Sequence, residues 1–292
     1  MSLSRLWLVY RFPRFYPPFS LLKEVAWFFF LGILLGNVGC VAPPAVPDSP
    51  IRKTTGHQLL EKLDQKEQAS TSLKALFRAN LQGEGFPISY RVDGVFLYKR
   101  PHTIRLKGFT RFGGILFNFL LNGDRYRLVL PNEKQVFVGD VGDLHPSNAV
   151  NLPVQLSLRA MEIVLGKVRG APEDSVTFVE DGNRYRFDVH EVSHGQNLQG
   201  LPLLTKRVWV DGQHLQVNQV EYLSIQGEKT LAIHAKDFRR VKDASPIEHT
   251  TIILPYQVQA ENFREQGSVA LEFQEIVANV QLDPKEFGLA SF

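Results

Sequence analysis

The sequence predicts a mainly β fold of the α+β class, in which one large, curved antiparallel sheet forms a half-open barrel closed by a few helices. Three observations predict it. Roughly a dozen segments alternate apolar and polar residues, which is typical of half-buried strands. Two segments have helical spacing, but they do not alternate with the strands, so a doubly wound parallel fold is excluded. About 235 residues follow the first 55, enough for one sizeable core.

A short amphipathic helix is expected first, over residues 56–68. Leu59, Leu60 and Leu63 lie on one side of it, and charged residues lie on the other. The period then changes to two, which predicts a half-buried strand. The apolar residues at its odd positions are Leu73, Ala75, Phe77, Ala79 and Leu81.

Further strand-like segments follow, separated by turn residues. Breaks at Asn122-Gly123 and Asn132-Glu133 are typical of hairpin turns. One interruption, residues 152–166, has helical spacing, with Pro153 near its start and Gly166 beyond its end. The expected strands before it are ISYRVDGVFLYKR, HTIRLKGF, ILFNFLLNG, RYRLVL and KQVFVG. Those after it are SVTFVED, NRYRFDVHEV, LTKRVWVDG, HLQVNQVEYLSIQG, KTLAIHAKDFRRV, EHTTIILPY and SVALEFQEIVANVQL.

The chain begins with a basic leader and an apolar run that ends beside its single cysteine, Cys40. A basic region, an apolar region and a small residue before a lone cysteine are the layout of a bacterial lipoprotein signal, in which the cysteine is lipidated. This pattern predicts a signal peptide over 1–39, a Pro-rich tether over 40–55 and a barrel domain over 56–292. The expected location is the cell envelope, at the outer membrane and facing the periplasm.

Two alternatives to lipidation stay open. Asn37 stands where such signals usually carry leucine, so the leader can also be read as an uncleaved anchor or as part of a cleaved soluble product. The apolar run from Val25 to Val38 is short for a helix that crosses the roughly 30 Å apolar core of a bilayer, which needs about 20 residues. In all three readings the rest of the chain leaves the cytoplasm.

The charge balance argues against nucleic-acid binding. The leader holds four of the 33 basic residues and one of the 30 acidic residues, so 29 of each remain in the rest of the chain. A nucleic-acid-binding protein needs a concentrated basic face, and the sequence beyond the leader has no excess of positive charge to build one.

The order of segments resembles that of the LolB-like outer-membrane lipoproteins of the LolA/LolB superfamily. The similarity covers roughly residues 56–290. It rests on SLKALFRANL, KRPHTIRLKGF, ILFNFLLNGDRYRLVLPNEKQVFVGD, a helix ending in VLG, KRVWVDGQHLQVNQVEY, LAIHAKDFRRV and NVQLDPKEFGL. The resemblance implies an unclosed, twisted sheet around an apolar cavity that accepts acyl chains.

The resemblance also implies site residues. In the loop GFTRFGG, Phe112 followed by Gly113 matches the apolar tip with which LolB-like proteins enter the lipid interface. An aromatic side chain tucked over the barrel mouth is the alternative. An acyl cavity needs a uniformly apolar face, and an ordinary filled core needs the same face. The residues that supply it are Ile115, Phe117, Phe119 and Leu121.

His190, Glu191 and His194 match H-E-x-x-H, a zinc-protease motif that requires a helix. The preceding segment reads as a strand, on which the two histidines would lie about 13 Å apart at roughly 3.3 Å per residue. Gly195 would also end a helix at this point. The sequence therefore disfavours a metal site, and a zinc metalloprotease is only a remote alternative.

We therefore predict a lipid-anchored, non-enzymatic protein without a cofactor. It would bind acyl chains and assist lipoprotein or lipid localisation to the outer membrane. The expected partners are membrane lipid, the acyl chains of lipoproteins or lipids, and a LolA-like periplasmic carrier, and the chain is expected to be a monomer. The main alternative is a structural or assembly lipoprotein that has a filled core and holds a protein partner.

Overall fold

The computed structural model describes most of the chain beyond the leader and tether. The described ranges are 53–83, 86–140, 151–168, 174–191, 203–245, 251–264 and 266–287, with the backbone alone for 86–90 and 151–157. Pro50–Phe292 forms one compact unit, which holds every strand and the whole described core. The other unit, Met1–Ser49, lies outside the described residues, as does Cys40. The predicted signal peptide and tether therefore stay predictions.

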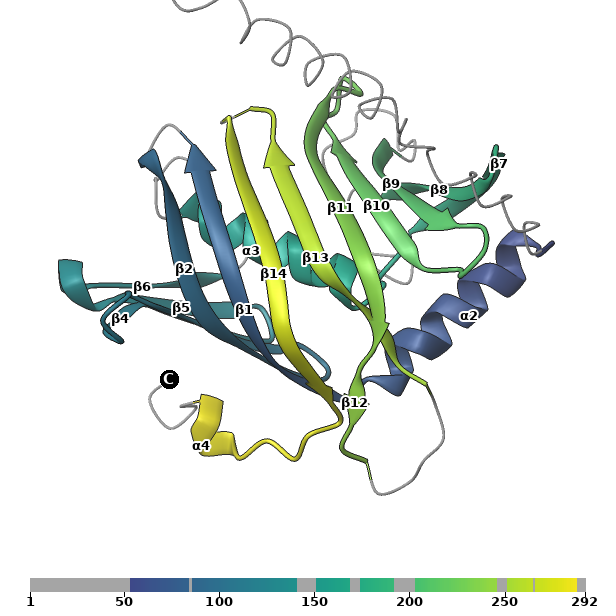
Figure 1. Cartoon of the computed structure of the whole chain (residues 1–292). Coiled ribbons are helices and arrows are strands. Elements are labelled where there is room, and N and C mark those ends of the chain that lie inside the picture. The colour runs from purple at the N-terminus through teal and green to yellow at the C-terminus, as the bar shows by residue number, and fades with distance from the viewer. Residues whose placement is uncertain are drawn as a thin grey trace, which may run out of the picture. The chain divides into compact units, whose positions relative to one another are not determined.

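A single sheet of fourteen strands dominates the described residues (Figure 1). Its order is β6-β5-β4-β3-β2-β1-β14-β13-β11-β10-β9-β8-β7, and β12 pairs with β14 outside this path. The bounds in the first half are β1 (Ser72–Gly83), β2 (Phe86–Lys99), β3 (Thr103–Phe109), β4 (Ile115–Asn122), β5 (Arg125–Leu130) and β6 (Gln135–Asp140). Those in the second half are β7 (Ser175–Asp181), β8 (Arg184–Glu191), β9 (Leu203–Asp211), β10 (Val217–Leu223), β11 (Lys229–Arg240), β12 (Lys242–Asp243), β13 (Ile253–Asn262) and β14 (Gly267–Ala278).

The sheet is antiparallel and open, as predicted. Strands β6 and β7 stand at opposite ends of the order and do not pair with one another, so the barrel does not close through them. The pairing of β12 with β14 is the parallel exception. Strands β1 and β14 join the two halves of the chain, with Leu73 opposite Ala278 and Leu81 opposite Val269.

Helix α3 (Asn151–Val164) crosses one face of the sheet, in contact with β10, β11, β13 and β14 (Figure 1). We call this the inner face. Helix α2 (Gly56–Ala69) buries Leu59, Leu60 and Leu63 in the same core, as its leucine spacing predicts. None of the helices that the structure describes has the length and apolarity needed to cross a membrane.

Neighbouring residues of one strand point to opposite faces, and the sheet uses both. Phe119 on β4 is buried in the main core of the inner face, whereas its neighbour Leu120 belongs to a small second cluster on the outer face. Helix α4 (Pro284–Phe287) covers this second cluster with Phe287. Lys74 on β1 also pairs with Glu286 of α4 at 3.0 Å.

The sequence predicts most of these elements. The helices at 56–69 and 151–164, the alternation in β1 and the hairpins at Asn122-Gly123 and after Pro131 are confirmed. Helical spacing predicts two helices, and the described residues also form a third, α4. The short strand β12 is a further addition to the predicted strands. The segment EHTTIILPY was placed too early, because β13 begins at Ile253 and continues to Asn262, where it pairs with both β11 and β14.

Candidate functional site

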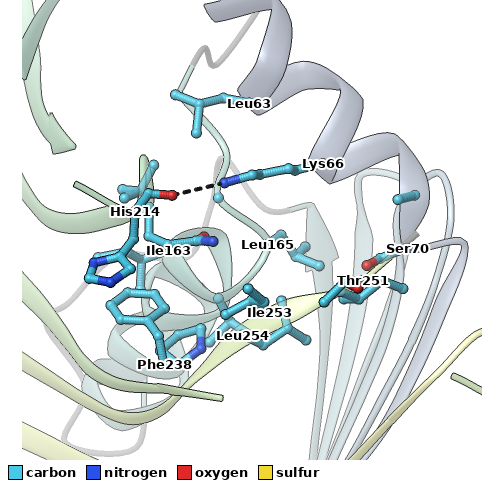
Figure 2. Close-up of a pocket in the computed structure, with 17 residues that line it drawn as sticks. Leu63, Lys66, Ser70, Ile163, Leu165, His214, Phe238, Thr251, Ile253 and Leu254 are labelled. Carbon is cyan, nitrogen blue, oxygen red and sulfur yellow. Dashed lines mark hydrogen bonds between the residues drawn. The ribbon is translucent and has the colours of Figure 1, made fainter. Parts of the chain in front are cut away.

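An apolar cavity of about 300 Å³ lies where α2, the end of α3 and the sheet meet (Figure 2). Ligand cavities generally measure roughly 300–1,000 Å³, so this one is at the lower bound. Its apolar lining residues are Leu63, Ala69, Ile163, Val164, Leu165, Val217, Phe238, Ile252, Ile253, Leu254 and Pro255. The other lining residues are Lys66, Ser70, Gly166, His214, Gln216 and Thr251.

Helix α2 forms one wall, and its start is fixed by a capping box. The Thr55 side chain accepts a hydrogen bond from Gln58 N, and the Gln58 side chain accepts one from Thr55 N. At the other end of the helix, Lys66 Nζ donates to the Leu215 carbonyl at 2.8 Å. It also donates to the His214 carbonyl at 3.5 Å, and Figure 2 draws this second bond. The lysine thereby joins α2 to the turn between β9 and β10 while its stem borders the cavity.

The Asp211 carboxylate stabilises this turn between β9 and β10. Asp211 Oδ1 accepts hydrogen bonds from Gln213 N at 3.1 Å and His214 N at 2.6 Å. Leu215 then takes a left-handed backbone conformation, with φ of 53°, which is uncommon for a residue with a side chain. The turn thus presents its carbonyls to Lys66 and leaves Gln216 and Val217 against the cavity.

The C-terminal end of α3 forms the opposite wall, and it too is capped. Gly166, with φ of 72°, allows Gly166 N to donate to Ile163 O at 3.0 Å and Lys167 N to donate to Glu162 O at 3.1 Å. This pair of bonds is a Schellman motif, which stops a helix and turns the chain away. Ile163, Val164 and Leu165 therefore meet the cavity at a fixed helix end.

A polar cluster lies on the inner face, beside the last turn of this helix. Glu162 of α3 accepts hydrogen bonds from Tyr222 Oη at 2.6 Å and from Arg159 Nη1 at 2.8 Å. The Arg159 guanidinium also lies 4.9 Å from the centre of the Tyr222 ring. Lys206 of β9 lies 5.9 Å from the same ring centre. We call Arg159, Glu162, Lys206 and Tyr222 the α3 polar cluster.

The charges of the α3 polar cluster shift its pKa values. Burial by itself raises the pKa of the Glu162 carboxyl, but Arg159, Lys206 and the Tyr222 hydroxyl together hold it below its ordinary value. Burial lowers the pKa of Lys206, and the attraction of Glu162 offsets only part of this shift. Burial and Glu162 raise the pKa of Tyr222 well above its ordinary value, so the phenol stays a donor.

The predicted cavity-lining row on β4 lies elsewhere on the inner face. Phe119 and Leu121 are buried in the main core, Phe117 packs partly against it, and Ile115 is exposed. Phe117 lies over Gly108 of β3, where an added Cβ would come within 2.3 Å of its ring. None of these four residues lines the described cavity, so their contact with an acyl chain stays a prediction.

Phe112 stands at the tip of the β3–β4 hairpin and is 100% exposed. Thr110 N donates to Gly114 O at 2.8 Å and Gly113 N donates to Thr110 O at 3.0 Å, which closes the tip. Gly113 has φ of 82°, a conformation that favours glycine. The aromatic side chain therefore points to solvent and is not tucked over the sheet, while its insertion into a membrane stays a prediction.

His190 and Glu191 lie at the end of strand β8, where His190 is opposite Ser175 and Leu204. The helix that H-E-x-x-H requires is therefore not present at these two positions, and His194 lies outside the described residues. Within the described ranges, no group of three or more His, Cys, Asp or Glu residues could hold a metal ion.

Comparison with known proteins identifies the fold. No protein-family model and no curated protein sequence matches the chain. Among solved structures, an outer membrane lipoprotein-sorting protein domain from Vibrio parahaemolyticus matches with a TM-score of 0.54 and 10% identity over 80% of this chain and 96% of its own. A LolA superfamily protein from Nitrosomonas europaea matches with a TM-score of 0.50 and 11% identity over 80% and 98%. The chain has a LolA-like fold.

A third match is a DUF1329 family protein from Desulfovibrio piger, with a TM-score of 0.57 and 12% identity over 81% of this chain and 97% of its own. Identities this low show the fold alone. The fold predicted from the order of segments is thus confirmed, whereas the roles predicted for individual residues are not tested by these matches.

Sequence reasoning missed both the described cavity and the α3 polar cluster. The cavity is built from residues on α2, α3, β11 and β13, which only the folded sheet brings together. Lys206 did leave a signal, because it shares the apolar row of β9 with Val208 and Val210. A lysine in such a row indicates a buried charge that needs a partner.

Replacing Glu162 by Gln should destabilise the LolA-like domain by about 1.5–3 kcal/mol at pH 7, the usual worth of hydrogen bonds to a charged group. The pKa of Glu162 is lowered in the folded state, so its stabilisation is complete above the unfolded-state pKa of about 4.3 and is lost as the pH falls through the folded-state pKa. The difference from wild type should therefore shrink by pH 3. Urea unfolding at both pH values measures it.

Glu275→Gln is the matched control, because Glu275 is exposed on β14. It should leave the free energy of unfolding nearly unchanged at both pH values. An equal loss at pH 7 and pH 3 in Glu162→Gln would show that the carboxylate charge is not what stabilises the cluster.

Proposed function

We propose that the chain is a lipid-anchored protein of the bacterial envelope that binds acyl chains and assists lipoprotein or lipid localisation to the outer membrane. The observation that carries this proposal is the apolar cavity of about 300 Å³ between the sheet and the ends of α2 and α3. The LolA-like fold supports it, as does the description of the Vibrio parahaemolyticus neighbour as a lipoprotein-sorting domain.

The cavity has the chemistry that an acyl chain needs. Eleven of its seventeen lining residues are apolar, and the Lys66 ammonium donates to the carbonyls of His214 and Leu215. Each methylene group that moves from water into such a lining gains about 0.8 kcal/mol. Ile253 is 38% exposed and Thr251 is also exposed, so the lining reaches the surface there. We propose that this surface is the mouth through which a chain enters.

The predicted β4 row extends the same apolar surface. Phe119 and Leu121 belong to one hydrophobic cluster with Leu63, Ile163 and Leu254 of the cavity wall. We propose that acyl chains longer than the cavity continue between the sheet and α3 toward Ile115, Phe117, Phe119 and Leu121. No chemical step is needed, because relative affinity is sufficient to drive transfer between two apolar environments.

Membrane attachment is assigned to two separate features. Cys40 would carry the permanent lipid anchor, and Phe112 with Gly113 would form a tip that enters the lipid interface during transfer. Arg111 beside Phe112 is exposed and carries the positive charge that anionic head groups attract. The partners of the protein would be membrane lipid and acylated cargo, handed over by a LolA-like carrier.

Filling the cavity mouth should weaken binding of an acyl chain. In residues 41–292, which contain the complete compact unit, Ile253→Trp places an indole at the mouth and should weaken binding of a fluorescent fatty-acyl probe at least about tenfold. Ile225→Trp is the matched control, because Ile225 is 73% exposed on the β10–β11 turn and lies outside the cavity. Fluorescence titration gives both dissociation constants.

Saturable binding that is unaffected by Ile253→Trp would place the acyl site elsewhere. No binding by folded wild type would favour the alternative of a protein partner. Val136 and Val138 are exposed on β6, the strand at one edge of the sheet. These valines would then be the first place to look for that partner.

Removing the aromatic tip should weaken membrane contact. Burying a phenylalanine is worth about 1.5–3 kcal/mol, so Phe112→Ser should lower partition of residues 41–292 onto lipid vesicles by about tenfold or more. Phe263→Ser, at the exposed β13–β14 turn, is the control for loss of any exposed aromatic. Equal vesicle sedimentation of wild type and Phe112→Ser would refute the assignment.

Lipidation of Cys40 is tested on the full chain. The mass of the protein extracted from membranes should correspond to a mature chain that begins at Cys40 and carries acyl groups, and Cys40→Ser should move the protein out of this form. A membrane-extracted protein that retains residues 1–39 would instead identify the leader as an uncleaved anchor.

A further inference from the structure

Lys206 is the most deeply buried cation that the structure describes on the inner face, with 5% of its surface exposed. Its strand, β9, directs Lys206, Val208 and Val210 to one side, and both valines belong to the main hydrophobic core. The side chain extends toward Tyr222, another member of the α3 polar cluster. A charged group in this position is costly unless another group neutralises it.

The neutralisation by the protein is incomplete. Among the described residues, none accepts a hydrogen bond from the Lys206 ammonium, which carries three donors. The charges that act on it are those of Glu162, Arg159, Lys167 and Glu191. With Lys206 itself, three cations therefore face two carboxylates, and Glu162 is already engaged by Tyr222 and Arg159. Among the described residues named here, one positive charge is left over.

The α3 polar cluster is accessible and close to the cavity. The Arg159 side chain is 50% exposed, so the cluster opens to solvent on that side. Glu162 directly precedes Ile163, which lines the cavity, and Tyr222 lies on the same strand as Val217, another lining residue. Residues 217–222 of β10 span about 17 Å at roughly 3.3 Å per residue. The α3 polar cluster and the apolar cavity thus share one strand and one helix.

From this juxtaposition we infer that the ligand of the inner face is an anionic amphiphile. Its carboxylate or phosphate head group binds Lys206 and Arg159, and its acyl chain runs along β10 and α3 toward the cavity. This inference rests on the proposed acyl-binding function and adds the charge of the head group to it. Arg159 suits the role because its guanidinium has five donors and gives one to Glu162.

The test compares two probes that share one polyene chain and differ in their head group, which is charged in one and neutral in the other. Residues 41–292 are titrated with cis-parinaric acid and with its methyl ester, whose polyene chains are identical. Wild type should bind the acid about tenfold more tightly than the ester, a difference of about 1.4 kcal/mol. Lys206→Met removes the charge, keeps an unbranched apolar side chain one atom shorter, and should abolish the preference, with affinity for the ester unchanged.

Two further variants keep the result interpretable. Lys236→Met removes an exposed lysine on the outer face of β11 and should preserve the preference. Arg159→Gln changes a half-exposed residue, so it tests the cluster even where Lys206→Met does not fold, and it should reduce the preference several-fold. Displacement of the probe by decyl phosphate, decanoate and decanol then separates a phosphate head group from a carboxylate.

The outcomes are distinct. Loss of the acid preference in Lys206→Met supports an anion site. Equal binding of acid and ester by wild type, or equal weakening of both by Lys206→Met, overturns the inference while the acyl-binding function stands. Binding of neither probe by wild type overturns the proposed function together with the inference that rests on it.

Discussion

The packing of α3 across the inner face is the interaction on which the rest of this structure depends. An antiparallel sheet of this size that does not close on itself leaves an apolar face in need of cover. Helix α3 supplies that cover at β10, β11, β13 and β14, the strands of the second half of the chain. Helix α4 covers only a small cluster on the other face, whereas α2 and α3 contribute residues to the large core.

The end of α3 then determines where the protein has a cavity. The Schellman motif at Gly166 stops the helix before it reaches α2, and the Lys66 bond to Leu215 holds α2 against the β9–β10 turn. The apolar space between these two helix ends is the cavity. Glu162 of the α3 polar cluster lies two residues before Val164, the last residue of α3, which places charge beside the apolar cavity. An amphiphile combines the same two properties.

The sequence predicted the features that depend on local pattern. Alternation in β1, the leucines of α2 and the spacing of α3 were sufficient for the sheet and its main helices, and their order was sufficient for a LolA-like fold. Features that depend on distant pairing could not be predicted in this way. Helix α4 is a four-residue turn stabilised by its outer-face contacts, and the cavity joins residues about 190 positions apart, from Leu63 to Pro255. The charges that surround Lys206 are likewise defined only once β9 and α3 meet.

The central claim is that the cavity between α2, α3 and the sheet holds an acyl chain. The most direct measurement uses a fatty acid with a diazirine at the end of its chain, photolysed in complex with residues 41–292, with the adducts mapped by peptide mass spectrometry. If an acyl chain occupies the cavity, adducts should form on the lining residues Leu165, Phe238 and Ile253, and excess unlabelled fatty acid should prevent their formation. Adducts confined to exposed sites such as Phe112 and Val136, or adducts that excess fatty acid does not prevent, would contradict the claim.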